Sequence, residues 1–266
     1  MARKLSISRA WDETREVLRR DGRLIAIVAL ALLVLPSTVQ ALVSPEAPAG
    51  KLPEPGAWMA VALIAILIGI VGQLAVIRLA IGPQTSVGEA IGHGARRMPA
   101  LVGAMLLWLV PLVGLIVALG RTMQQAEPSG AVAIGILLLV ALFVYLGARL
   151  ITATAVASAE NHGPVGILQR SWALSRGKWW RLFGFLALFV IAAIALTLAT
   201  EALTGLLVQI LFGTPEPMSV GALVRALIGH LVIAAVTIVF LVMLARIYLQ
   251  LAGPEPVEPS VPSSGT

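Results

Sequence analysis

The chain contains no cysteine and few charged residues. The absence of cysteine excludes disulfides, thiolate metal sites and cysteine nucleophiles. Only 12% of the residues are charged, about half the share in a soluble domain. The three histidines, His93, His162 and His230, lie on different segments, and no nucleophile-elbow, zinc-protease or phosphate-loop motif is present. The sequence therefore predicts no catalytic site, no metal site and no cofactor.

Most of the remaining chain is apolar. Hydrophobic residues make up 59% of it and the mean hydropathy is +0.96, a composition typical of membrane proteins. A membrane-spanning helix needs about 20 mostly apolar residues, because it must satisfy its own backbone polar groups. Six stretches qualify: about 24–43, 57–77, 99–119, 131–152, 182–203 and 225–249.

These stretches predict an all-α polytopic membrane protein with six transmembrane helices. We expect Pro36 and Pro111 to kink their helices without ending them. A single integral domain is predicted over residues 1–252. The tail, residues 253–266, is rich in Pro and Ser and is expected to be disordered.

Lysine and arginine are distributed unevenly between the two sides of the predicted bundle. Sixteen of the nineteen fall on one side, in residues 1–23, 78–97 and 149–181 and at Arg246. The other three are Lys51, Arg121 and Arg225. Because basic segments stay on the cytoplasmic side during insertion, the sequence predicts a multi-pass protein of the bacterial inner membrane with both termini in the cytoplasm.

Amphipathic segments precede the first, third and fifth apolar stretches. They begin at Ile7, Val87 and Val165, 80 and 78 residues apart, and a near-constant spacing is typical of repeats. We predict three hairpin-like units, about 5–80, 85–158 and 163–250, each with an amphipathic helix in the cytoplasmic headgroup region.

The third amphipathic segment combines aromatic and basic residues. Tryptophans at this depth anchor a helix at the membrane interface, and basic groups face anionic lipid. The predicted anchors are Trp11, Trp172, Trp179 and Trp180, and the basic residues assigned to lipid headgroups here are Arg170, Arg176, Lys178 and Arg181.

Residues 147–184 resemble the membrane domain associated with bacterial glycerophosphoryl diester phosphodiesterases and its stand-alone relatives. The similarity is carried by Ala148-Arg149-Leu150, Glu160, Leu168, Arg170-Ser171-Trp172, Leu174, Gly177 and Trp179-Trp180-Arg181. The resemblance implies six spans with helices on the inner surface. It implies no hydrolysis here, because catalysis in that family resembles that of a separate soluble barrel domain, and no connection in this chain is long enough to form one.

Three arginines lie in the last turns of the returning spans: Arg78, Arg149 and Arg246. One interpretation is a ring of guanidinium groups that binds phosphate headgroups, since arginine forms paired hydrogen bonds with phosphate. The other, which their position near helix ends favours, is that each side chain only extends to the interface.

Four further polar residues are candidates for structural or coupling roles. Glu160 is expected to pair with Arg170 or Arg149 and to hold the third amphipathic helix, rather than to transfer protons. Glu201 and Arg225 form a predicted pair at the outer side. His230 is a candidate for proton coupling, although a hydrogen bond to a neighbouring helix is favoured.

These patterns favour a non-enzymatic membrane protein that engages anionic lipid headgroups, as a scaffold or accessory in envelope or lipid homeostasis. A small transporter or flippase-like carrier is the alternative, and a membrane-embedded lipid-modifying enzyme has the least residue support. The net charge of +6 does not predict nucleic-acid binding, because the basic residues follow amphipathic membrane-facing segments. Membrane lipids are the predicted partners, with a protein partner or a homo-oligomer also open.

Overall fold

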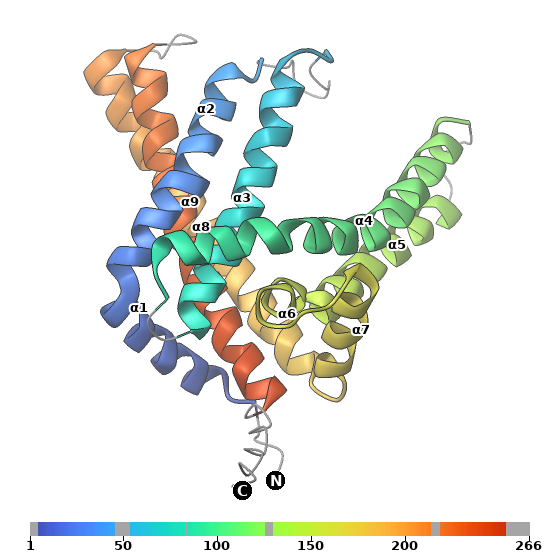
Figure 1. Ribbon diagram of the computed structural model, residues 1–266. Coiled ribbons are helices and arrows are strands. Elements are labelled where there is room, and N and C mark those ends of the chain that lie inside the picture. The colour runs from blue at the N-terminus through green and yellow to red at the C-terminus, as the bar shows by residue number, and fades with distance from the viewer. Residues whose placement is uncertain (1–4, 46–53, 83–84, 126–129, 214–218, 254–266) are drawn as a thin grey trace, which may run out of the picture.

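The computed structural model shows a helical protein, and it describes residues 5–45, 54–82, 85–125, 130–213 and 219–253 (Figure 1). Within these ranges there is no strand. The elements are α1 (Ile7–Ala29), η1 (Leu30–Val34), α2 (Leu35–Val43), α3 (Trp58–Ile81), α4 (Val87–Gln125), α5 (Gly130–Leu150), α6 (Ala153–Ala159), α7 (Pro164–Ser175), α8 (Trp179–Phe212) and α9 (Val220–Ala252).

Six helices in the described part of the chain are long and apolar enough to cross a membrane. They cover Ile7–Val43, Trp58–Ile81, Val87–Ala118, Ala133–Ala159, Trp179–Leu211 and Val220–Ala252. Large side chains are widely exposed on them, for example Leu137 (68%) and Ile210 (73%), as expected of surfaces that face lipid. The predicted all-α polytopic fold is confirmed, whereas the predicted tail beyond Gly253 lies outside the described residues.

The first span continues through its proline by changing its helical pitch. The π-helix η1 immediately precedes α2, whose first turn contains Pro36. Proline lacks an N–H and its ring crowds the carbonyl four residues earlier, and a short π-helical turn accommodates such a disruption. As predicted, the helix is not ended there.

Amphipathic segments and spans are joined differently in the three units. α1 and α4 run from their amphipathic starts into the membrane-spanning part without a break, and α4 does so through Pro99 and Pro111. Only α7 is a separate helix, because the chain turns at Gly177, where φ is +70°. Glycine adopts this left-handed conformation without a steric penalty. That the units are sequence repeats stays a prediction.

Helix α3 lies at the centre of the fold and contacts α1, α2, α4, α6 and α9. Its residues Leu74 to Ile77 are fully buried. The start of α4 packs closely on α3, because a Cβ on Gly94 would lie 2.7 Å from the carbonyl oxygen of Val71. The α4–α5 hairpin leans away from the other spans (Figure 1).

The two ends of the described chain lie side by side. The backbone N–H of Ser6 donates a 3.0 Å hydrogen bond to Oε1 of Gln250. Figure 1 shows that the end of α2 and the start of α3 point away from this region. The same holds for the end of α4 and the start of α5, and for the end of α8 and the start of α9. This arrangement places α7 and the start of α8 on the same side as both ends.

Candidate functional site

A hollow of about 420 Å³ lies where α5 ends and α8 begins. It is lined by Tyr145, Arg149, Gly177, Lys178, Trp179, Trp180 and Arg181, which we call the basic hollow. Three of these residues are cationic and none is a carboxylate. The hollow therefore brings together Arg149 and four residues predicted as headgroup ligands or anchors in the third amphipathic segment. These are Lys178, Trp179, Trp180 and Arg181.

Arg149 packs against two aromatic rings that also contact each other. Its guanidinium carbon lies 4.9 Å from the ring centroid of Trp172 and 5.4 Å from that of Tyr145, within the range of cation–π attraction. Its Nε donates to the hydroxyl of Tyr145 (3.2 Å), and Nη1 donates to Oγ of Ser175 (3.5 Å). The side chain is thus fixed in position rather than simply extended toward the interface.

The aromatic wall of the basic hollow depends on the turn at Gly177. After this turn, Trp179 lies 5.7 Å from Tyr145 and 4.6 Å from Trp180, centroid to centroid, and stacks on Phe183 at 5.1 Å. The indole N–H of Trp179 donates to the backbone carbonyl of Tyr145 (3.4 Å). The tryptophans thereby contact the protein on one side, while Trp180 remains 76% exposed.

Arg181 connects the basic hollow to the N-terminal segment. Its Nη1 donates to the carbonyl oxygen of Leu5 at 3.1 Å. Arg170 lies elsewhere, paired with Glu160, and Arg176 is exposed at the end of α7. The third amphipathic segment therefore divides its basic residues between the hollow, a structural ion pair and the surface.

Glu160 is the centre of a hydrogen-bond network that joins three parts of the fold. Its carboxylate accepts hydrogen bonds from Arg170 Nε (2.9 Å) and Tyr248 Oη (2.7 Å), and Oε2 lies 2.7 Å from His162 Nε2. Arg97 of α4 donates to the backbone carbonyl of the same residue at 2.7 Å. Of the two partners predicted for Glu160, the structure shows Arg170 and not Arg149.

The network also determines the charge of this carboxylate. Burial raises the pKa of Glu160, but the hydrogen bonds from Tyr248, Arg170 and His162 together lower it by more, so the pKa lies below its ordinary value. The ionised form is the one that these donors stabilise. A proton-carrying role at neutral pH is not favoured by this environment.

The other two arginines of the predicted ring lie in separate surroundings. Arg246 donates to the carbonyl oxygen of Ala80 at 2.6 Å, and its buried Nε has no hydrogen-bond partner among the described residues. Arg78 lines a smaller hollow of about 270 Å³ with Thr85, Glu89, His93 and Arg96. The three arginines therefore occupy three different settings rather than one ring.

The chain matches one protein family over residues 5–251, a domain of unknown function called DUF7847. It belongs to this family. No curated protein and no solved structure matches it. The family match gives no link to glycerophosphoryl diester phosphodiesterases, and that resemblance stays a prediction for this DUF7847 protein.

Glu201 and Arg225 form an ion pair, and His230 forms a local hydrogen bond. Arg225 Nη2 lies 2.8 Å from Oε2 of Glu201, as the predicted pairing requires. His230 Nδ1 lies 2.7 Å from the carbonyl oxygen of Ala226. The sequence favours a hydrogen bond from His230 to a neighbouring helix. In the structure its partner is instead a carbonyl of its own helix, four residues earlier.

Several residues of the site were not predicted. Tyr145 lies four residues before Arg149, on the same helical face, and this spacing was an available signal. Tyr248 contacts Glu160 across 88 residues, and Arg97 contacts Asn161 across 64 residues. No local sequence pattern indicates contacts over such separations. Within the described ranges, no three His, Cys, Asp or Glu side chains are grouped to hold a metal ion.

Proposed function

We propose that this DUF7847 protein is a non-enzymatic protein of the bacterial inner membrane that binds anionic lipid headgroups in the basic hollow. The observation that carries the proposal is the convergence of Arg149, Lys178 and Arg181 with three aromatic rings in one hollow that has no carboxylate. Guanidinium and ammonium groups bind phosphate strongly. Aromatic rings at the membrane interface hold such a site at headgroup depth.

The orientation is part of the proposal. The hollow lies on the side to which the charge distribution assigns sixteen of the nineteen basic residues, and such a side is expected to face the cytoplasm. The cytoplasmic leaflet is anionic, and each basic residue near it contributes about 1 kcal/mol of attraction. A scaffold or accessory role in lipid homeostasis agrees with a headgroup site in which Arg149 is held by Tyr145 and Trp172.

The carrier alternative has less support. Transport predicts a polar chamber between the spans, whereas the basic hollow lies at the end of α5 and Arg78 lies in the last turn of α3. The guanidinium of Arg149 packs against the rings of Tyr145 and Trp172. These positions favour binding at the surface of the bilayer.

Lipid retention after purification tests this function. The triple variant Arg149→Gln, Lys178→Gln, Arg181→Gln is expected to lose phosphatidylglycerol, with an affinity lower by about a hundredfold if each charge contributes ~1 kcal/mol. The matched control is Arg15→Gln, Arg19→Gln, Arg23→Gln, which removes the same charge from exposed positions on α1. Equal retention by the two variants in native mass spectrometry contradicts the proposal.

A further inference from the structure

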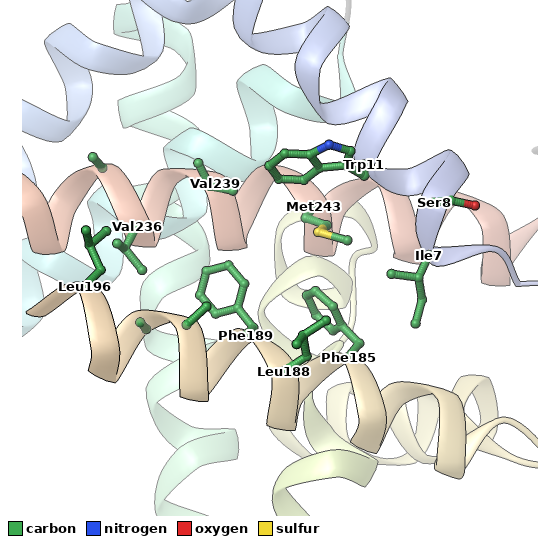
Figure 2. A pocket seen from close by; sticks show the side chains of 13 residues that line it. Ile7, Ser8, Trp11, Phe185, Leu188, Phe189, Leu196, Val236, Val239 and Met243 are labelled. Atoms are coloured by element: carbon green, nitrogen blue, oxygen red, sulfur yellow. The ribbon is translucent and has the colours of Figure 1, made fainter.

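An apolar groove of about 580 Å³ runs between α8 and α9 and ends at the first turns of α1. Phe185, Phe189 and Leu196 line it from α8, and Val236, Val239 and Met243 line it from α9. Figure 2 shows Ile7 and Ser8 of α1 at one end of this groove and Leu196 and Val236 at the other. We call it the α8–α9 groove.

The length of the groove corresponds to one leaflet of a bilayer. From Phe185 to Leu196, α8 rises about 16 Å at 1.5 Å per residue. The hydrocarbon core of a membrane is about 30 Å thick. The groove is thus about half as long as the hydrocarbon core is thick.

The walls of the groove are apolar, and Arg181 lies beside its α1 end without lining it. Arg181 precedes the lining residue Phe185 by about one helical turn. Its Nη1 donates to the carbonyl oxygen of Leu5, two residues before the lining residue Ile7. A cation at one end and apolar walls beyond it complement an anionic amphiphile.

We propose that the α8–α9 groove holds one acyl chain of an anionic phospholipid whose phosphate is bound at Arg181. The proposal rests on the proposed function, because Arg181 also lines the basic hollow. It adds that the protein recognises the lipid by its chain as well as by its headgroup.

A transmembrane helix of a second copy fits this groove less well. Such a helix is about 10–12 Å wide and crosses the full hydrocarbon core of about 30 Å. The groove is about half that long. An acyl chain matches its length.

Photo-cross-linking of the full chain in nanodiscs tests the proposal. The nanodiscs contain phosphatidylethanolamine and a phosphatidylglycerol probe with a diazirine in its acyl chain. Adducts are expected to concentrate on the groove segments of α8 and α9. Ala192→Trp, which fills the groove, should remove them, whereas Ala195→Trp, at an exposed position on the same helix outside the lining, should not.

The charge at the groove end has its own measurement. Arg181→Gln should reduce groove adducts of the phosphatidylglycerol probe about fivefold, the effect of one basic residue near an anionic headgroup. Groove adducts of a phosphatidylcholine probe with the same chain should change less. Equal reduction for the two probes overturns the assignment of the phosphate to Arg181.

Other outcomes also overturn the proposal. One is a spread of adducts evenly over all lipid-facing helices. Another is an equal number of groove adducts in Ala192→Trp and Ala195→Trp. A third is dissociation of a dimer by Ala192→Trp alone, which assigns the groove to a second copy. If the triple Gln variant still loses phosphatidylglycerol, only the groove assignment fails and the headgroup site stands. If that variant retains phosphatidylglycerol, both proposals fail.

Discussion

Tyr248 donates a 2.7 Å hydrogen bond to Oε1 of Glu160, across 88 residues of sequence. The bond joins α9, the last helix in the described part of the chain, to the connection between α6 and α7. Because Arg170 and His162 contact the same carboxylate, Glu160 holds α7 in place against the bundle. The position of α7 in turn determines where Trp172 lies against Arg149.

Removing the Tyr248 hydroxyl should destabilise the protein. Tyr248→Phe is expected to lower the free energy of unfolding by about 1–2 kcal/mol, because a hydrogen bond to a charged group is lost while the ring is retained. Thermal unfolding in detergent measures the change. Tyr145→Phe is the control, because it removes a hydroxyl that does not contact Glu160. Only Tyr248→Phe should alter how stability depends on the ionisation of Glu160.

Stability should fall in acid through Glu160. Its pKa is lowered in the folded protein, so its contribution is full above the ordinary glutamate pKa of about 4.3 and is lost as the pH falls through the lowered value. Tyr248→Phe removes one of the groups that lower the pKa and should shift this loss to higher pH. Melting temperatures measured from pH 7 to pH 3 test this, and Glu160→Gln should remove this component of the pH dependence.

The contact between α3 and α4 should not tolerate a methyl group at Gly94. Its Cβ would lie 2.7 Å from the carbonyl oxygen of Val71, so Gly94→Ala should destabilise by about 1–3 kcal/mol through overpacking. Gly88→Ala lies on the same helix with open space around it and should be neutral or stabilising by up to about 1 kcal/mol. Equal melting temperatures for the two variants contradict this packing.

The turn at Gly177 should be required for lipid binding as well as for stability. Gly177→Ala places a side chain at φ +70°, a strain of about 1–2 kcal/mol, and is expected to shift Trp179 and Lys178 in the basic hollow. Phosphatidylglycerol retention should therefore decrease. Gly184→Ala, on α8 with open space around it, is the control, and a decrease in both variants contradicts a specific role for the turn.

The absence of cysteine allows a direct test of orientation. A membrane-impermeant maleimide should label Lys178→Cys in inverted membrane vesicles only. It should label Glu54→Cys, in the connection between α2 and α3, in right-side-out vesicles only. The opposite pattern would place the basic hollow on the outer side and remove the reason for expecting anionic lipid there.

Local sequence accounts for the spans and for part of the site. The charge-free run from Leu24 to Val43 predicts a helix because lipid offers no other way to satisfy its backbone. The sequence predicts Arg170 or Arg149 as the partner of Glu160, ten and eleven positions away, and the structure shows Arg170. The break at Gly177 uses a φ of +70°, which glycine adopts without a steric penalty, although other glycines of this chain, such as Gly94, continue their helices.

The sequence by itself determined the helical class, the six spans and the uneven distribution of charge, because each depends on neighbours along one helix or on the bilayer. Only the tertiary structure decided that Arg149 enters an aromatic hollow while Arg246 turns to the carbonyl of Ala80. All three arginines of the predicted ring end similar apolar runs. Their different partners follow from how the helices pack, and packing is set by side chains that are distant in the sequence.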